Sequence, residues 1–178
     1  MVLFLKLKLF SLLVSCPRWR ERDAASELWY VLTSDLGEDD VNVEVTEVPG
    51  LIAAFSSSGP FSVISRLRKM LEEGSLNLSL CLKFVPLEVV VPTNLDRIKE
   101  GVEKLKHKIS RDEKWRVTLR KRFTGLEGDE VIREAADLID WGVVDLKNPD
   151  KILRIEIMGG WTGISIHSPE EELSVRKT

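Results

Sequence analysis

Apolar and polar side chains alternate in the stretch Lys114-Trp115-Arg116-Val117-Thr118-Leu119-Arg120-Lys121-Arg122. Since successive side chains of a strand point to opposite faces of a sheet, this alternation predicts a strand over residues 114–122. One face of the strand would join a core through Trp115, Val117 and Leu119. The opposite face would carry Lys114, Arg116, Thr118, Arg120 and Arg122. Cations spaced about 6.8 Å apart, or at multiples of that distance, repel one another, so we expect this face to bind a polyanion such as RNA.

The charge of the whole chain does not by itself favour a nucleic-acid partner. The 178 residues carry a net charge of -3, whereas phosphate-binding proteins are usually basic. The charge is unevenly distributed, however, because residues 97–122 contain eleven bases and four acids, a net charge of +7. Residues 1–92 carry -3 and residues 123–178 carry -6. The acidic average therefore conceals a basic segment that includes the predicted strand.

Further candidate RNA contacts surround this strand. Lys108 and Arg111 precede it, Lys121 lies within it, and Phe123 follows it, where its ring could stack on a base. Arg133 belongs to the next predicted helix. Two other interpretations stay open: the bases pair with Asp and Glu of neighbouring strands, and Arg133 pairs with an acid four residues away.

The first half of the chain predicts a separate domain. In order, residues 1–92 show the patterns of strand, helix, strand, strand, helix and strand, which is the βαββαβ arrangement of a ferredoxin-like sheet. The first strand includes Leu5, Leu7 and Leu9, which alternate with lysines. The last strand lies in the long β-rich run from residue 80 to residue 91, with Pro86 at a bend or an edge position.

Residues 93–168 predict a second domain that mixes helices and strands. A helix with an apolar stripe spans about 95–109, a second helix follows the basic strand at about 127–140, and two strands cover 152–158 and 161–168. The last ten residues, 169–178, are polar and predict a flexible tail. The predicted fold class is therefore α+β.

The N-terminal segment and the two cysteines bear on the cellular compartment of the protein. Residues 1–16 are mostly apolar, but they are too few to span a membrane, and their period-two alternation favours a strand over an export signal. Cys16 and Cys81 lie in apolar runs without a nearby histidine or second cysteine, which is typical of buried thiols. We therefore predict a cytoplasmic protein with no membrane association.

The sequence lacks the common motifs of catalysis and cofactor binding. It has no phosphate loop, no dinucleotide fingerprint after a strand and no paired cysteines at metal-binding spacing. His107 and His167 stand outside any metal or nucleophile motif. We therefore expect no catalytic residue, no cofactor and no metal, and we predict that the protein is not an enzyme.

Several segments of the second half match one known family. They are Trp115-Arg116-Val117 leading into Arg120-Lys121-Arg122, the helix start Asp129-Glu130-Val131-Ile132, the segment Val144-Asp145-Leu146-Lys147-Asn148-Pro149-Asp150, Arg154-Ile155-Glu156-Ile157 and Gly163-Ile164-Ser165-Ile166. Together they resemble the THUMP domain, an RNA-binding module of tRNA-modifying enzymes. The domain core would span 93–168, although residues 86–93 also look like its start and the family signature could begin near residue 60. In that family a ferredoxin-like domain commonly comes first.

The resemblance implies a function. The chain is similar to the stand-alone THUMP proteins that assist the tRNA cytidine acetyltransferase, so we expect a non-catalytic protein that presents the acceptor end of tRNA to a separate modification enzyme. The expected RNA contacts are Lys108, Arg111, Lys114, Arg116, Arg120, Lys121, Arg122, Phe123 and Arg133. Two alternatives remain: a scaffold module that docks an acidic protein through the basic strand, and an RNA-binding accessory of another tRNA-modifying enzyme.

Overall fold

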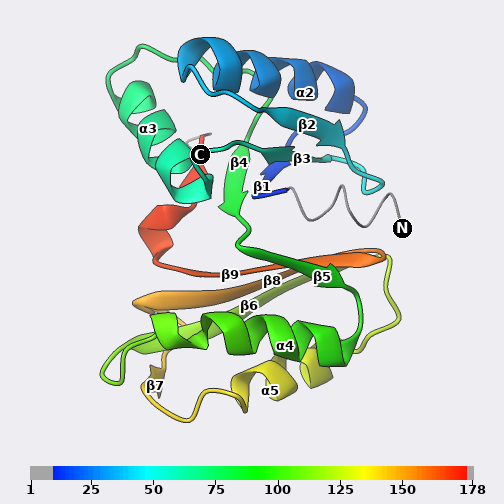
Figure 1. Cartoon of the computed structure of the whole chain (residues 1–178), viewed down its shortest axis with the longest axis vertical. Helices are drawn as coiled ribbons and strands as arrows, with labels where there is room; N and C mark the ends of the chain where they lie inside the picture. Colours follow the sequence, from blue (N-terminus) through cyan, green and yellow to red (C-terminus); the bar gives the residue numbers. More distant parts are fainter. Residues whose placement is uncertain (1–9, 176–178) are drawn as a thin grey trace. The chain divides into compact units, whose positions relative to one another are not determined.

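The computed structural model of the chain describes residues 10–175, which fold into two compact units (Figure 1). The N-terminal unit comprises residues 10–87 and 171–175, and the C-terminal unit comprises residues 88–170. Each unit has its own sheet and its own pair of helices, so the predicted mixture of helices and strands is confirmed. No helix between residues 10 and 175 is long and apolar enough to cross a membrane.

A five-stranded antiparallel sheet forms the N-terminal unit, with the strand order β10-β4-β1-β3-β2. Its strands are β1 (Leu12–Ser15), β2 (Asn42–Val45), β3 (Leu51–Phe55), β4 (Lys83–Pro86) and β10 (Leu173–Ser174). Helices α2 (Glu21–Tyr30) and α3 (Pro60–Glu72) cover one face of this sheet (Figure 1), and a π-helical segment, Val31–Asp35, continues α2. Strands and helices share one apolar core, which includes Leu12, Val14, Leu28, Ile52, Ile64, Leu67 and Phe84.

The described elements up to β4 come in the order that the sequence predicts: strand, helix, strand, strand, helix and strand. Pro60 begins α3, where its fixed φ suits the first helical turn. Gly74, with a φ of 73°, follows the end of this helix. The predicted alternation of Leu5, Leu7 and Leu9 lies outside the described residues.

The structure differs from the prediction of a flexible tail at 169–178. A short 3-10 helix, Pro169–Glu171, leads into β10, whose Leu173 pairs with Phe84 of β4. Leu173 is buried in the core of the N-terminal unit, and Val175 donates its backbone N–H to the carbonyl of Leu82 at 2.8 Å. Burial of Leu173 thus orders residues that look polar in sequence, while residues 176–178 lie outside the described part.

The β-rich run that ends at residue 91 divides between the two units. The backbone changes partners within two residues: Leu87 donates to the carbonyl of Ser11, and Glu88 donates to the carbonyl of Ile164. The segment after this change is strand β5 (Val89–Pro92), which pairs with the C-terminal unit's last long strand. The C-terminal unit therefore begins at residue 88, whereas the sequence placed the boundary after residue 92.

The C-terminal unit is a second five-stranded sheet, with the strand order β5-β9-β8-β6-β7. Its other elements are α4 (Leu95–Leu105), the 3-10 helix Lys106–Lys108, β6 (Lys114–Arg122), α5 (Gly128–Ala136), β7 (Val143–Val144), β8 (Lys151–Met158) and β9 (Trp161–His167). Strand β6 runs parallel to both neighbours, β7 and β8. Helices α4 and α5 cover one face (Figure 1), and the core between helices and sheet includes Ile98, Val102, Val131, Leu153, Ile155 and Ile164.

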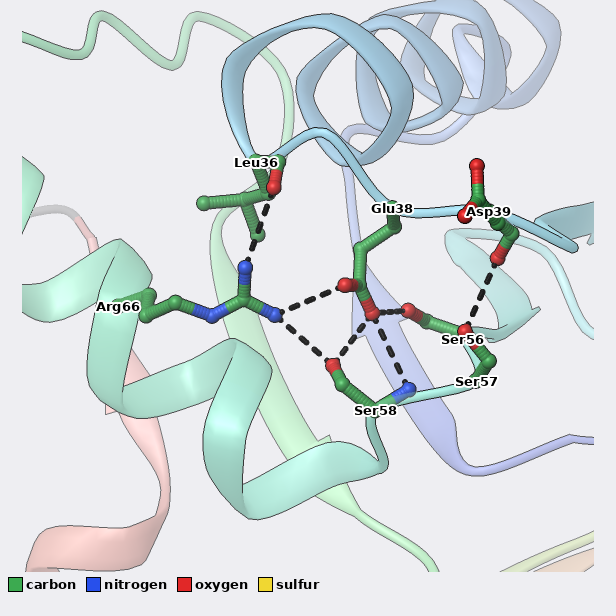
Figure 2. Close-up of polar contacts among 7 residues, drawn as sticks. All are labelled: Leu36, Glu38, Asp39, Ser56, Ser57, Ser58 and Arg66. Carbon is green, nitrogen blue, oxygen red and sulfur yellow. Dashed lines mark hydrogen bonds and ion pairs between the residues drawn. The ribbon is translucent and has the colours of Figure 1, made fainter.

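A polar cluster fixes the connection between β3 and α3 in the N-terminal unit (Figure 2). The carboxylate of Glu38 accepts hydrogen bonds from the hydroxyls of Ser56 and Ser58 and from the backbone N–H of Ser58. Arg66 of α3 pairs with Glu38 at 3.1 Å and donates to Ser58 Oγ at 2.8 Å and to the carbonyl of Leu36 at 3.1 Å. The segment after the π-helix, the loop after β3 and α3 are thereby joined through one carboxylate.

Candidate nucleic-acid interface

Strand β6 has the two different faces that its sequence predicts. Trp115 is buried in the core beneath the helices, Val117 and Leu119 pack against that core, and the indole N–H of Trp115 donates to the carbonyl of Trp141 at 2.9 Å. The alternating positions, Arg116, Thr118, Arg120 and Arg122, therefore belong to the opposite face of the sheet. The alternation in sequence identified both the strand and its core face correctly.

The cationic face is not a continuous row of free charges. In the parallel register, Arg120 lies beside Glu156 of β8, and Arg122 lies beside Met158. Arg122 Nη1 is 2.6 Å from Glu156 Oε1, and Arg154 Nη1 is 3.0 Å from Glu156 Oε2. Glu156 is only 2% exposed and so is a buried carboxylate held by two guanidinium groups. Arg122 therefore pairs with an acid on the neighbouring strand, which is the alternative interpretation that the sequence left open.

Two other predicted cations make contacts near the start of β6. Lys114 Nζ lies 3.9 Å from Asp145 Oδ2, and Arg116 Nη1 donates to the carbonyl of Leu146 at 2.7 Å. The backbone N–H groups of Asn148 and Lys147 donate to Asp145 and lower its pKa, with the Lys114 charge a smaller cause. Both cations therefore help to hold the turn that follows β7.

Lys108 also has a structural role. Its ammonium group lies 2.7 Å from Glu88 Oε1 and donates to the carbonyl of Ile166 at 2.6 Å. Glu88 in turn accepts the backbone N–H of Ile166 at 2.9 Å. This lysine joins the 3-10 helix after α4 to the residue before β5 and to β9, which leaves little of its charge for a ligand.

A different group of predicted residues is exposed at the C-terminal end of β6. Arg120 and Lys121 are exposed, and Phe123 keeps 66% of its surface in solvent. Within residues 10–175, the Arg120 side chain has no hydrogen bond or ion pair, and the Lys121 ammonium donates to the carbonyl of Leu126 at 3.1 Å. We call Arg120, Lys121 and Phe123 the β6-end cluster.

The backbone at Phe123 is unusual. Its φ is 55°, in the left-handed region that residues other than Gly, Asn and Asp seldom adopt. The following loop leads directly into α5, whose N-cap residue Glu127 makes no side-chain hydrogen bond to the first turn. An exposed aromatic ring in a strained conformation thus lies within three residues of two exposed cations at the end of β6, Arg120 on the face opposite the helices and Lys121 on the side of α5. Aromatic and cationic side chains together are the composition of a base-stacking and phosphate-binding surface.

The remaining two candidates do not gather at one place. Arg133 lies on the exposed side of α5, the helix that begins next to the β6-end cluster, and it pairs with neither Asp129 nor Asp137. Arg111 lies in the turn before β6. Since the nine residues of β6 extend about 26 Å, Arg111 and the β6-end cluster lie at opposite ends of the strand.

Sequence reasoning missed Glu156 as the partner of Arg122. The two residues are 34 positions apart, and only the register of β6 with β8 brings them together. In the part of the chain that the structure describes, no group of three or more His, Cys, Asp or Glu side chains could hold a metal ion.

Comparison with known proteins identifies this unit. The family model of the THUMP domain matches residues 92–167. The chain contains a THUMP domain. Strand β6 with its exposed end lies inside the matched residues.

Solved structures share the fold at low sequence identity. The protein PH1313 from Pyrococcus horikoshii is 18% identical with a TM-score of 0.70, over 93% of this chain and 55% of that chain. A 4-thiouridine synthetase solved as a complex with RNA and bound ATP is 16% identical with a TM-score of 0.59, over 93% and 42%. A predicted N6-adenine-specific DNA methylase from Listeria monocytogenes is 16% identical with a TM-score of 0.53, over 93% and 42%.

These structures correct the prediction that the protein is not an enzyme. The chain with its THUMP domain spans about half the length of the solved structures that it matches, and those structures include a synthetase and a predicted methylase. The prediction took a short chain without catalytic motifs as a sign of no activity, and it is contradicted because the same fold forms part of longer enzymes. Comparison with curated protein sequences found no match to the chain.

Proposed function

We propose that the THUMP domain of this chain binds tRNA through the β6-end cluster, with Arg133 extending the surface onto α5. The observation that supports this most strongly is Phe123, whose ring is two-thirds exposed at a backbone φ that costs free energy. A ring in this position adds almost nothing to the core. Beside an exposed and unpaired Arg120, it suits an RNA ligand.

The chemistry of the cluster favours an unpaired part of the tRNA. Arg120 and Lys121 offer charge to phosphates, which supply most of the affinity in RNA binding. A phenylalanine ring stacks on a base only when that base is free of its helix, and paired bases of A-form RNA are not accessible in this way. The acceptor end, which the resemblance to the family also implies, provides unpaired bases next to a phosphate backbone.

The other predicted cations have a smaller part in this proposal. Lys108 and Arg122 form close ion pairs with Glu88 and Glu156, and removing them would disturb the fold first. The remaining three, Arg111, Lys114 and Arg116, lie toward the start of β6. We place them at the margin of the RNA surface, where they add to its positive potential.

The proposal extends to the domain architecture and to the reaction. The strand order β4-β1-β3-β2, with two helices on one face, supports a ferredoxin-like domain in the N-terminal unit ahead of the THUMP domain. From the resemblance, the modification is acetylation of cytidine, with a tRNA cytidine acetyltransferase as the partner. Nucleoside analysis of bulk tRNA from cells lacking the protein tests this: loss of acetylcytidine supports it, and loss of a different modified nucleoside contradicts it.

Binding of tRNA is tested by a substitution that removes one positive charge from the cluster. Arg120→Gln is expected to weaken binding and to reduce the slope of log K against log salt by about 0.7 to 0.9. The matched control is Lys104→Gln, because Lys104 of α4 is also exposed and has no ion pair within residues 10–175. Equal affinities and equal slopes for the two variants, measured by filter binding at several salt concentrations, would refute the proposed surface.

A further inference from the structure

A second exposed aromatic residue shares the unusual backbone of Phe123. Between residues 10 and 175, only three residues other than glycine have a positive φ: Trp19 at 72°, Asp40 at 56° and Phe123 at 55°. Trp19, which belongs to the N-terminal unit, is 87% exposed and is the most exposed of the five tryptophans in the chain. The two aromatic residues in this group both follow arginines in the sequence.

The turn that holds Trp19 explains its backbone but not its side chain. Arg20 donates its backbone N–H to the carbonyl of Pro17 at 3.2 Å, which makes Trp19 the third residue of a β-turn. A positive φ at this position is that of a type II turn, where Gly or Asn is normally found. A tryptophan here strains the backbone, and an 87% exposed ring offers almost no burial in return. Neither turn preference nor core packing accounts for the residue.

The turn is held in place from both sides. Cys16 donates its backbone N–H to the carbonyl of Gly50 at 2.9 Å, and Gly50 donates its own N–H to Glu21 Oε2 at 3.0 Å. Gly50 has a φ of 82°, and a Cβ atom there would lie 3.2 Å from the carbonyl oxygen of Cys16. The hairpin between β2 and β3 therefore fixes the start of α2, and the indole is presented on an ordered turn.

Three arginines, Arg18, Arg20 and Arg22, lie within three residues of Trp19 in the chain. Arg18 and Arg22 are exposed and have no ion pair in the described part of the chain, while Arg20 pairs with Asp23 at 3.0 Å. The nearest other acid, Glu21, is occupied by the N–H of Gly50, and its pKa is lowered chiefly by that hydrogen bond. Arg22 therefore has no carboxylate partner in the described part of the chain, and Arg18 acts on Glu21 only through its charge, the smallest of the causes that lower the Glu21 pKa.

We propose that Trp19, with Arg18 and Arg22, is a second RNA contact, at which the indole stacks on an unpaired base and the two arginines bind the adjacent phosphates. This proposal rests on the RNA-binding function proposed above and adds a contact on the N-terminal unit. A protein partner would be expected at an apolar patch. The immediate neighbours of Trp19 in sequence are arginines, whose charge and planar groups suit a nucleic acid better.

The test titrates the full chain with a twelve-nucleotide oligoadenylate and follows tryptophan fluorescence and affinity. In Trp19→Gly, we expect the RNA-induced quenching to disappear and the affinity to fall by about 5- to 150-fold, the range that corresponds to one stacked base. Since glycine adopts a positive φ without strain, the midpoint of urea unfolding should hold or rise. Arg18→Gln and Arg22→Gln should each reduce the salt slope by about 0.7.

Asp40→Gly is the matched control. It relieves the same kind of backbone strain in the same unit and removes no ring, so quenching should persist and affinity should not fall. Unchanged oligoadenylate affinity in Trp19→Gly would overturn the proposal and assign the ring to another kind of partner, such as a protein surface. A lower unfolding midpoint in that variant would also overturn it, because the ring would then serve packing. Failure of the unaltered chain to bind oligoadenylate would refute this contact, while the tRNA test of Arg120→Gln would still decide the β6-end cluster.

Discussion

Replacing Glu38 with glutamine is expected to lower the free energy of unfolding of the N-terminal unit by about 2 kcal/mol at pH 7. Burial by itself raises the pKa of Glu38, but hydrogen bonds from Ser56, Ser58 and Arg66 outweigh it and bring the pKa to about 2, against an ordinary value of 4.5. That difference corresponds to about 3 kcal/mol. The Arg66 side chain is 38% exposed, and solvent screening of the pair reduces the expected effect to about 2 kcal/mol.

The sign of the pH dependence follows from the direction of this pKa. Because the pKa of Glu38 is lower in the folded chain than in the unfolded chain, its contribution is complete above about pH 5. The contribution is lost as the pH falls from 4.5 toward 2, where the carboxyl becomes protonated in both states. Glu38→Gln lacks this titration, so the difference in stability between the two proteins should shrink over the same range.

Urea unfolding at pH 7, 5, 4 and 3 measures this difference directly. The matched control is Ser57→Ala, since the Ser57 hydroxyl donates to the carbonyl of Asp39 and makes no bond to Glu38 (Figure 2). We expect the control to change stability by less than about 0.5 kcal/mol at every pH. A Glu38→Gln effect that stays constant from pH 7 to pH 3, or that equals the control, would refute the role given to this carboxylate.

Two further variants test the C-terminal unit. Phe123→Gly removes the ring and relieves the backbone strain. In filter binding, its affinity for tRNA should fall about 5- to 150-fold, while the midpoint of urea unfolding should hold or rise. A loss of stability would show that the ring serves the fold. Glu156→Gln leaves Arg122 and Arg154 without their shared carboxylate and should lower the free energy of unfolding by about 3 kcal/mol. A free energy of unfolding equal to that of the unaltered chain would contradict the buried pairing.

Periodicity in the sequence predicted the local elements well. Apolar alternation located β6 and its core face, because Trp115, Val117 and Leu119 need burial whatever the partner strands are. Proline and glycine marked the ends of α3 for a similar reason, since their backbone preferences act within a few residues. Both predictions depend on interactions that are close in sequence.

Features that depend on long-range pairing were not predictable in this way. The partner of Arg122 is set by the register of β6 with β8, and no spacing between Arg122 and Glu156 announces it. The division of the β-rich run depends on which strand each half pairs with, and the order of residues 171–175 depends on the burial of Leu173 against β4. For Trp19 a signal was present, the Arg-Trp-Arg triplet, but its importance appears only with the positive φ and the exposed ring.

The central claim, that tRNA lies on the β6-end cluster, is tested most directly by photochemical crosslinking of tRNA to the full chain, followed by mass spectrometry of the linked peptides. We predict that the linked residues lie at 120–123, chiefly Phe123, and that the linked nucleotides belong to the unpaired acceptor end. Crosslinks confined to the start of β6, near Lys114 and Arg116, or to paired regions of the tRNA would contradict the account.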